Sequence, residues 1–205
     1  MNVNGKLLTA FPPLTLSSMF TLESDRLILK DWKRSDWKDA HAYASDPEVS
    51  KFMIWGPNTE AETKDFIDTA MDVASVKPRR GYELAMVLKE TNSIVGGCGL
   101  QVVGKEGATA MIGYVLQHSL WGKGLMTEAA SRIIEFGFTD LKLHRVYATC
   151  DVENIGSARV MEKCGMRREA HFVKDMYIKK NWRDTYLYAM LETEWQARGT
   201  ASGAE

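Results

Sequence analysis

A glycine-rich turn between two apolar segments is the part of this sequence best suited to bind a charged ligand. The turn lies within residues 120–130 and places Gly122 and Gly124 on either side of Lys123. Glycines permit a tight turn and remove side chains that would keep a ligand away from the backbone. The following segment predicts a helix, whose first N–H groups lack partners and carry partial positive charge. The pattern therefore predicts a phosphate or pyrophosphate site, although an ordinary strand-to-helix turn would explain it equally well.

Two familiar phosphate motifs are excluded by the residues of this turn. A P-loop requires Ser or Thr directly after the lysine, where this chain has Gly124. The dinucleotide-binding fingerprint requires a third glycine, but Leu125, Met126 and Thr127 follow. The glycines of residues 96–99 lie inside an apolar run, which favours a strand packed closely against a neighbour.

Residues 121–129 resemble the acetyl-CoA loop of the GNAT acetyltransferases. Residues 154–166, with Asn-x-x-Ser at the start and Lys-x-Gly at the end, are similar to a second signature found in the Rim-type branch, which acetylates the N-termini of ribosomal proteins. The segments 181–184 and 188–191 fit the same branch, and the resemblance extends from about Leu22 to Trp195. The chain departs from the pattern at Trp121, where the family usually has Arg or Gln, and at Met126, where it has a small residue. Neither change blocks a site made of backbone amides.

The resemblance implies acetyl-CoA as the co-substrate. It also implies that the strand before the glycine turn splays away from the strand at 145–150, so that backbone groups pair with the pantetheine arm as an added strand would. Two cations of the second signature could reach the 3′-phosphate of CoA, although lone surface cations are more often only solvated. The expected cofactor-binding residues are Tyr114, Val115, Leu116, Trp121, Gly122, Lys123, Gly124, Leu125, Met126, Thr127, Asn154, Ser157, Arg159 and Lys163.

Acetyl transfer to an amine requires a polarised carbonyl and a proton for the departing thiolate. Backbone N–H groups near Val115 and Leu116 could hold the carbonyl oxygen. In the resembling branch a serine at the position of Ser157 faces the thioester sulfur and is the proposed acid, so the resemblance makes Ser157 the expected acid. Many other members of the family use a later tyrosine, at a position where this chain has Met161. The donor is then Ser157 or water. Asn154 could contact the pantetheine amides or cap a helix, and both roles are compatible.

The general base is harder to find in the sequence. Many relatives place a glutamate on the central strand, at the position of Met111. The remaining candidates are Glu83, His118, Glu169 and Asp175. We take Glu83 as the catalytic candidate, although a carboxylate at such a position is more often only the polar face of a strand.

A bulky apolar cluster at residues 52–57 is the candidate acceptor-binding segment. Packing against the core would explain it without a function. By resemblance, Phe52 and Trp55 form one wall of the acceptor pocket.

Hydrophobic periodicity predicts a mixed α/β fold of the α+β type, with helices on a mostly antiparallel sheet. We expect one GNAT-like domain at residues 21–197, an N-terminal arm at 1–20 and a flexible tail at 198–205. The expected strands are 22–32, 82–88, 93–103, 109–117, 145–150, 168–179 and 185–194. The expected helices are 35–45, 59–76, 125–141 and one that begins at Asn154.

Composition limits the classes of function. The chain has 205 residues and a net charge of −1, so nothing favours nucleic acid as a partner. No apolar run is long enough to cross a membrane, and Pro12–Pro13 argues against a signal peptide. The three cysteines fit neither a metal site nor a redox pair, which favours a reduced, cytoplasmic protein without a metal. We expect a monomer or a homodimer.

Three functions stay open at this stage. The first is an acetyl-CoA-dependent N-acetyltransferase acting on a protein or peptide N-terminal α-amine. The second is the same chemistry on a small amine, such as a polyamine, an amino acid or an antibiotic. The third is an acyl-CoA-binding module with little turnover, because Met111 and Met161 stand at common catalytic positions.

Overall fold

In the computed structural model, which describes residues 19–104 and 108–201, eight strands form one sheet in the order β1-β2-β3-β4-β5-β6-β8-β7. All neighbouring strands are antiparallel except β5 and β6. The strands are β1 (Thr21–Glu23), β2 (Leu27–Asp31), β3 (Gly81–Leu88), β4 (Ser93–Val103), β5 (Thr109–Leu116), β6 (Arg145–Asp151), β7 (Arg167–Ile178) and β8 (Asn181–Leu191). The α-helices are α1 (Trp37–Ala44), α2 (Pro47–Ser50), α3 (Glu60–Ser75), α4 (Leu125–Thr139), α5 (Ile155–Lys163) and α6 (Glu192–Ala201).

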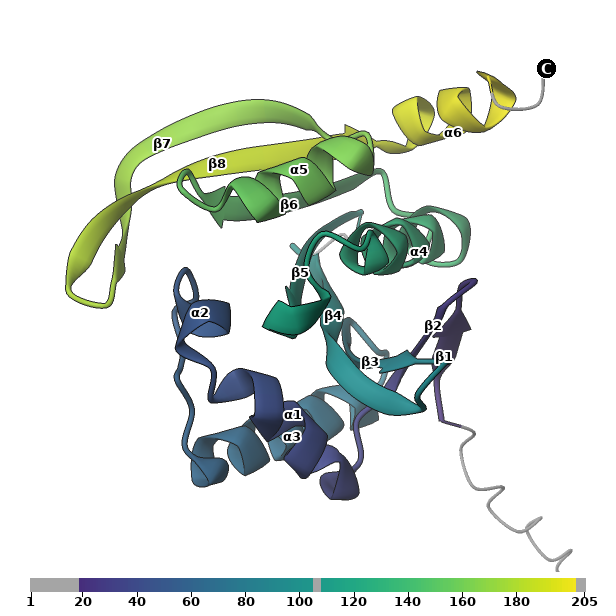
Figure 1. Cartoon of the computed structure of the whole chain (residues 1–205). Coiled ribbons are helices and arrows are strands. Elements are labelled where there is room, and N and C mark those ends of the chain that lie inside the picture. The colour runs from purple at the N-terminus through teal and green to yellow at the C-terminus, as the bar shows by residue number, and fades with distance from the viewer. Residues whose placement is uncertain (1–18, 105–107, 202–205) are drawn as a thin grey trace, which may run out of the picture.

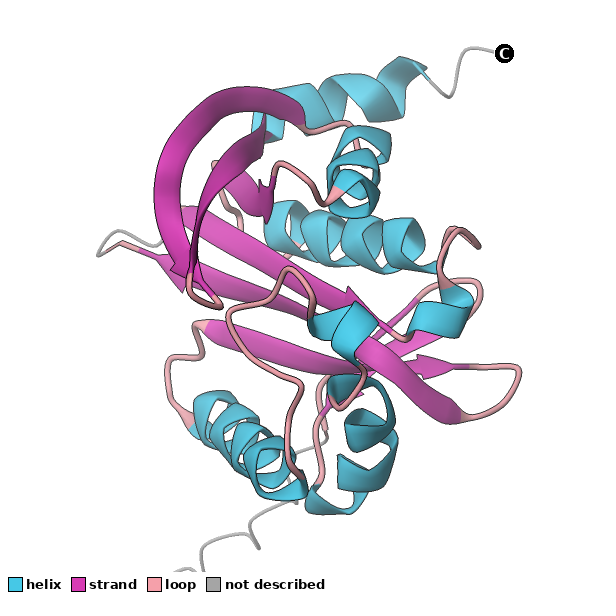
Figure 2. Ribbon diagram, turned by 60° about the vertical axis from the view of Figure 1, so that its left-hand side comes forward, coloured by secondary structure: helices cyan, strands magenta, loops and turns pink. Residues whose placement is uncertain are grey.

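The helices cover both faces of the sheet, with α1 and α3 on one face and α4 and α5 on the other (Figure 2). Alternation along each strand directs successive side chains to opposite faces. On β3, Leu84 and Met86 join the core beneath α4, whereas Ala85 and Val87 join the core beneath α1 and α3. This arrangement confirms the predicted fold class.

The two parallel strands separate soon after they meet. Pairing between β5 and β6 runs only from Thr109↔Arg145 to Met111↔Tyr147. Beyond that point β5 stays paired with β4 as far as Leu116, and β6 stays paired with β8 as far as Asp151. The two strands diverge in Figure 1, as the sequence analysis expected. Each therefore has one backbone edge without a strand partner.

The N-terminal prediction of one strand at 22–32 was wrong, because the segment is a hairpin of β1 and β2. The Ser24 N–H donates to the Leu27 carbonyl over 3.0 Å, which closes a turn at residues 24–26. Serine and aspartate favour such turns because their side chains can bond the nearby backbone. The predicted arm at 1–20 lies outside the described residues except for its last two positions.

The prediction at the C-terminal end was also wrong. Strand β8 begins at Asn181 rather than at 185, because Lys179 and Lys180 form the hairpin turn with positive φ angles of 49° and 67°. Residues 192–201 form helix α6 instead of ending a strand and starting a tail. Glu194 caps this helix by accepting from the Leu191 N–H over 2.8 Å, and the Trp195 ring packs 5.6 Å from that of Phe138. A segment without strong amphipathic periodicity is thus held in a helix by tertiary packing.

Candidate active site

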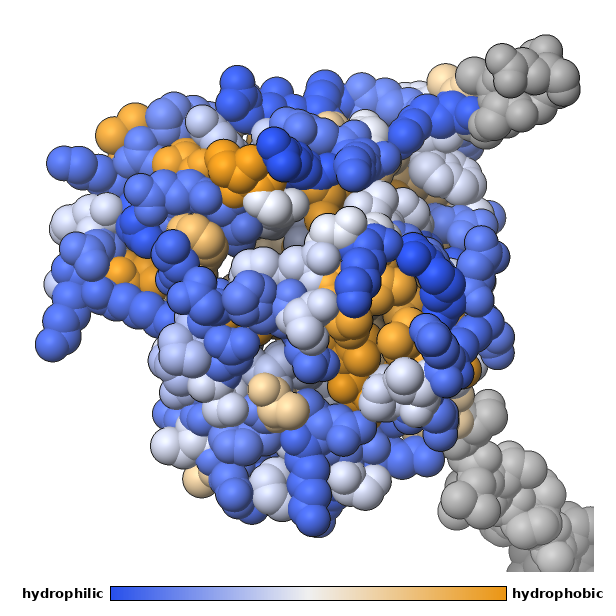
Figure 3. Space-filling view, viewed as in Figure 1, coloured by the Kyte–Doolittle hydropathy of each residue, from blue (hydrophilic) through white to orange (hydrophobic). Residues whose placement is uncertain are grey.

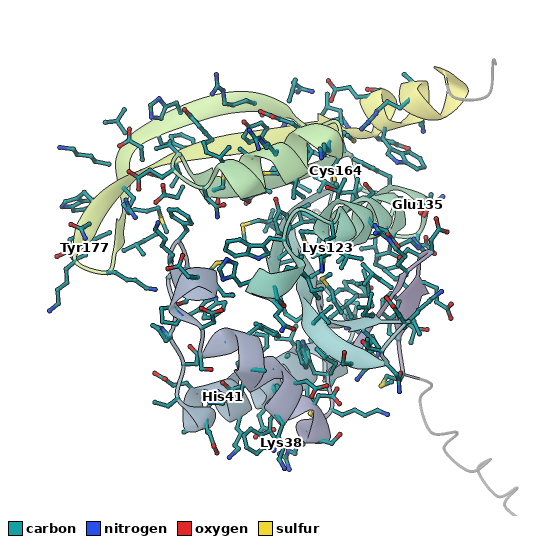
Figure 4. The ribbon with its side chains drawn as sticks, in the orientation of Figure 1. Lys38, His41, Lys123, Glu135, Cys164 and Tyr177 are labelled. Carbon is teal, nitrogen blue, oxygen red and sulfur yellow. The ribbon has the colours of Figure 1, made fainter. Side chains whose placement is uncertain are left out.

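The glycine turn has the strand–turn–helix geometry that the sequence predicted. Gly122 and Gly124 have φ angles of 75° and 76°, in the left-handed region that only glycine adopts without strain. Gly124 is the N-cap of α4. A Cβ atom added at Gly122 would meet nothing within 4 Å, so the turn faces open space. Lys123 lies at this turn in Figure 4.

Arg26 and Glu128 hold the turn in place, and the sequence analysis missed both. Arg26 Nη1 donates to the Lys123 carbonyl over 3.0 Å, and Arg26 Nε donates to Glu128 over 2.7 Å. Glu128 also accepts from the Arg26 backbone N–H and the Ser24 hydroxyl. Arg26 is about a hundred positions away in the chain, so no local motif could identify it. Because the guanidinium is ion-paired with Glu128, the net positive charge at the turn comes from Lys123.

Successive residues of β5 direct their backbone N–H and carbonyl groups to alternate sides of the strand, either towards β4 or towards the edge that β6 leaves open. Gln117 N–H donates to Val95 on the β4 side, whereas the Ala108 carbonyl accepts from His144 on the β6 side. Tyr114 and Leu116, at even positions like Ala108, therefore direct their backbone groups to the open edge. The backbone of Val115 instead faces β4, where this residue is paired with Gly97.

Trp121 closes one end of this open edge. Its indole N–H donates to the Leu116 carbonyl over 2.8 Å, and its ring lies 4.5 Å from that of His118. Trp121, which stands where the family usually has Arg or Gln, therefore attaches the glycine turn to the end of β5 through its ring. The N–H of Leu116 has no partner in the described part of the chain.

The side chains of Leu125 and Met126 are buried in the core, so only their backbone can contact a ligand. Thr127 is half-buried, and its carbonyl lies 3.6 Å from the Cys164 thiol.

Ser157 lies across the open edge from Tyr114. Its hydroxyl oxygen is 3.0 Å from the Tyr114 hydroxyl, which also donates to the Ser157 carbonyl over 3.1 Å. Asn154 caps α5 by accepting from the Ser157 N–H over 3.0 Å, which confirms the capping expectation. Burial raises the pKa of the Tyr114 phenol well above its ordinary value, although the hydrogen bond with Ser157 opposes this. Tyr114 is therefore protonated at neutral pH, and its hydroxyl holds Ser157 at the open edge.

Cys150 completes this group from the end of β6. Burial raises the pKa of its thiol to about 11, and a hydrogen bond with Ser157 partly opposes the rise. The thiol is therefore protonated at neutral pH and behaves as a structural neighbour of Ser157 rather than as a nucleophile.

Glu83 lies on the face of the sheet opposite to Tyr114, where its neighbours on the next two strands are glycines. Glu83 pairs with Gly99 on β4, and Gly99 pairs with Gly113 on β5, so the three share one row and one face. A Cβ atom at Gly99 would lie 2.6 Å from a Glu83 carboxylate oxygen, whereas one at Gly113 would meet nothing within 4 Å. The carboxylate thus lies across β4 towards open space above β5. Burial raises its pKa, and no group in the described residues donates a hydrogen bond to it.

The other base candidates are occupied or exposed. Arg145 donates to Glu169 over 3.0 Å and lowers the pKa of that carboxyl. Asp175 accepts from the Thr185 hydroxyl over 2.8 Å. His118 is exposed next to Trp121. Met111, at the position of the usual glutamate, is 40% exposed on the face that carries Gly113.

The acceptor-wall candidates lie on the side of the molecule that faces the β7–β8 hairpin. The Arg183 guanidinium of β8 lies 5.9 Å from the Phe52 ring, and Lys179 Nζ at the hairpin tip donates to the Ser50 carbonyl over 2.6 Å. Trp55 packs against the core beneath α1 and α3. The hairpin thus reaches across to α2, and apolar side chains gather on its outer part (Figure 3).

The two expected phosphate cations are both exposed on α5. Arg159 is exposed on α5 without a partner in the described residues, and Lys163 lines a cleft of about 520 Å³ beside Cys164 and Trp195. Figure 4 shows Cys164 at the end of α5. In the described residues no group of His, Cys, Asp or Glu could hold a metal ion, and no helix is long and apolar enough to cross a membrane.

An opened strand edge that runs into a cationic glycine turn can hold a ligand with an extended amide arm and a phosphate group. Comparison with known proteins assigns this architecture. The model of the acetyltransferase (GNAT) domain matches residues 26–167, and the chain belongs to the GNAT acetyltransferase family.

The family assignment agrees with individual relatives. The chain is 35% identical over 174 residues to the uncharacterized N-acetyltransferase YnaD of Bacillus subtilis, covering 85% of this chain and 98% of that protein. It is 32% identical to the uncharacterized N-acetyltransferase p20 of Bacillus licheniformis, covering 86% and 99%. The crystal structure of a GNAT-family acetyltransferase from Bacillus anthracis superposes with a TM-score of 0.76 at 35% identity, covering 85% and 100%. The RimL ribosomal-protein acetyltransferase in complex with CoA shares the fold, with a TM-score of 0.75 at 17% identity, over 84% of this chain and 98% of that one.

The geometry of the turn makes a prediction about cofactor affinity. Val at position 124 would force a β-branched residue into a left-handed backbone, at a cost of about 1–2 kcal/mol, and would displace the turn. We expect Gly124→Val to weaken CoA binding at least about tenfold in a folded protein, measured by calorimetry. Gly104→Val is the matched control, because Gly104 has a similar φ of 73° in a different turn. Equal CoA affinity in both variants would remove this turn from the binding site.

Proposed function

We propose that the protein transfers an acetyl group from acetyl-CoA to the α-amine of a peptide or protein N-terminus, in a ternary complex. When bound, acetyl-CoA supplies the acetyl group as an activated thioester. The observation that carries this proposal is the open edge of β5, which ends at the glycine turn that Arg26 holds. The edge offers the Tyr114 backbone and the Leu116 N–H to amide groups of an extended arm, and the turn offers Lys123 and helix N–H groups to phosphates. The backbone of Val115 is not part of this contact.

Ser157, which Tyr114 holds in place, is suited to protonate the leaving thiolate. Their hydroxyl groups touch each other at the open edge, and the Tyr114 phenol stays protonated at neutral pH. Formation of the new C–N bond breaks the C–S bond, and the sulfur then needs one proton. Ser157 would give its proton to the thiolate and recover one from water.

Glu83 is the candidate base on the other face of the sheet. Its carboxylate extends over Gly99 towards Gly113, which is a neighbour of Tyr114 in β5. Because glycine has no side chain, these two residues leave room for the acceptor amine or for a water that carries its proton. Burial raises the pKa of Glu83, which makes its carboxylate a better proton acceptor than an exposed one.

Amine basicity favours the α-amine over a lysine side chain. The two groups have pKa values of about 7.8 and 10.4, so deprotonation of lysine at neutral pH costs about 3.5 kcal/mol more. Glu83 is the single carboxylate that we propose takes the amine proton, either directly or through a water. Such a base deprotonates the less basic α-amine more readily than a lysine side chain. The Rim-type signature and the shared fold of RimL support the same choice.

A small-amine acceptor is the second candidate. A spermidine N(1)-acetyltransferase of Vibrio cholerae is 30% identical over 77 residues, which cover 38% of this chain and 44% of that protein.

The presence of Glu83 and Ser157 argues against a binding module without turnover. Three buried free cysteines agree with a cytoplasmic location. The oligomeric state, monomer or homodimer, stays a prediction.

A first prediction concerns Glu83. Removing the base in Glu83→Gln should lower kcat/KM about a hundredfold and abolish the acidic limb of its pH profile. Glu90→Gln, at an exposed turn between β3 and β4, is the matched control. A Glu83→Gln variant with unchanged kcat/KM at every pH would exclude Glu83 as the base.

The same variant should be more stable than the wild type at neutral pH. The folded-state pKa of Glu83 is raised, so between the unfolded and folded pKa values the folded chain binds more protons and loses stability as pH increases. Gln avoids this cost. We expect Glu83→Gln to raise the Tm at pH 7 and to lose this advantage below about pH 4, where the unfolded carboxyl is also protonated.

A second prediction concerns the acid. Ser157→Ala should lower kcat about a hundredfold while the Kd for CoA changes less than about threefold, because a proton donor acts mainly in the transition state. Tyr114→Phe should show a smaller effect of the same kind. A parallel loss of CoA affinity and kcat would make Ser157 a binding residue instead.

The acceptor itself provides the direct test of the proposed function. Peptides that carry both a free N-terminus and a lysine are incubated with the enzyme and acetyl-CoA near pH 7.5, and the product is located by mass spectrometry. We expect acetylation at the α-amine with little on lysine. Preferential lysine acetylation, or turnover of polyamines or antibiotics alone, would favour the small-amine or side-chain alternative.

A further inference from the structure

The glycine turn presents a run of unpaired backbone N–H groups. Among the described residues, none of the N–H groups of residues 122–127 has a hydrogen-bond acceptor. Helix geometry explains why the groups at the start of α4 are unpaired, but it does not fix the direction in which the preceding turn presents its own groups. A contact from outside the helix must hold that direction.

Arg26 supplies this contact at the peptide group between Lys123 and Gly124. Its Nη1 donates to the Lys123 carbonyl over 3.0 Å. A trans peptide group is planar, so its N–H points the opposite way from its carbonyl oxygen. Because the carbonyl is directed towards Arg26, the Gly124 N–H points away from Arg26, to a side where no described residue accepts it.

Glu128, in the first turn of α4, holds Arg26 in turn. Its carboxylate accepts from Arg26 Nε over 2.7 Å, from the Arg26 backbone N–H over 2.7 Å and from the Ser24 hydroxyl over 2.8 Å. Burial acts to raise the pKa of Glu128, but these hydrogen bonds outweigh it and lower the pKa below its ordinary value, so the carboxylate is charged at neutral pH. One chain of contacts therefore runs from Glu128 through Arg26 to the turn.

The charges of this chain do not explain its presence beside a site for anions. Arg26 and Glu128 form an ion pair, whose net charge is zero. A carboxylate near a phosphate repels it, so Glu128 by itself would weaken the binding of an anion. The geometry of the pair gives it a different use, because it fixes backbone donors that carry no net charge.

We propose that Arg26 is a positioning residue for acetyl-CoA: through the Lys123 carbonyl it directs the N–H groups of the glycine turn towards the pyrophosphate, and Glu128 orients Arg26 for this role. The inference rests on the proposed function only in taking acetyl-CoA as the donor, and it does not depend on the acceptor. Binding of the cofactor without any acceptor therefore tests it separately.

Calorimetry with CoA compares Arg26→Ala, Glu128→Ala and the double variant with the wild type. We expect each single variant to weaken CoA binding about tenfold, and the double variant to stay within about twofold of Arg26→Ala, because both residues act through one chain of contacts. The sign of the Glu128 effect is decisive, since loss of a nearby carboxylate would tighten CoA binding if charge alone mattered. Glu128→Gln serves if the alanine variant does not fold.

Arg132→Ala is the matched control. Arg132 is also on α4 and donates to the Glu23 carbonyl of the same β1–β2 hairpin over 3.0 Å, but its other pairing is with Glu135, farther along the helix from the turn. Its replacement should leave the Kd for CoA within about twofold of the wild-type value.

The KM for acetyl-CoA should increase in Arg26→Ala while kcat at saturating acetyl-CoA stays within about threefold, because the turn lies away from the reacting atoms. A pair with only a structural role would lower the Tm of both single variants and leave the Kd for CoA unchanged, which would overturn the proposal. Tighter binding in Glu128→Ala, or additive losses in the double variant, would also contradict it.

Dephospho-CoA separates positioning from direct contact, because it keeps the pyrophosphate but lacks the 3′-phosphate. Arg26→Ala should weaken its binding by the same factor as that of CoA. A loss seen only with CoA would make Arg26 a ligand of the 3′-phosphate and reject the positioning role. An enzyme that binds CoA as expected but acetylates no peptide would contradict the proposed function and leave this inference intact.

Discussion

The early separation of β5 from β6 is the feature on which the rest of this structure depends. Parallel pairing stops after Met111 and Tyr147, and each strand is then held only by its outer neighbour. Unpaired backbone groups are costly when buried, so an edge opened inside a sheet favours a ligand that can replace the missing strand. The glycine turn lies at the end of this edge, which aligns a backbone-binding segment with an anion-binding helix start.

The two faces of the opened sheet carry the two groups that we propose for proton transfer. Strand alternation places Tyr114 and Cys150 on the face of α5, next to Ser157, and places Glu83 on the other face. The proposed donor for the thiolate, Ser157, and the proposed acceptor of the amine proton, Glu83, thus lie on opposite faces of the sheet. Glycines at 99 and 113 are needed because any side chain there would fill the space in front of Glu83.

The sequence predicted the parts of the site that are encoded locally. The glycine turn, the Asn154 cap and the inner position of β5 follow from residue type and spacing over a few positions. Arg26 could not be found in this way, because its contacts with Lys123 and Glu128 join distant segments. Helix α6 was missed because packing of Trp195, rather than periodicity, holds it in place.

A crystal structure with a bisubstrate analogue tests the central claim most directly. In this compound the sulfur of CoA is joined through an acetyl linker to the N-terminus of a short peptide. The account predicts that the pantetheine arm pairs with the free edge of β5 and that the sulfur lies beside Ser157. An arm bound elsewhere, with β5 and β6 closed or their edges empty, would contradict it.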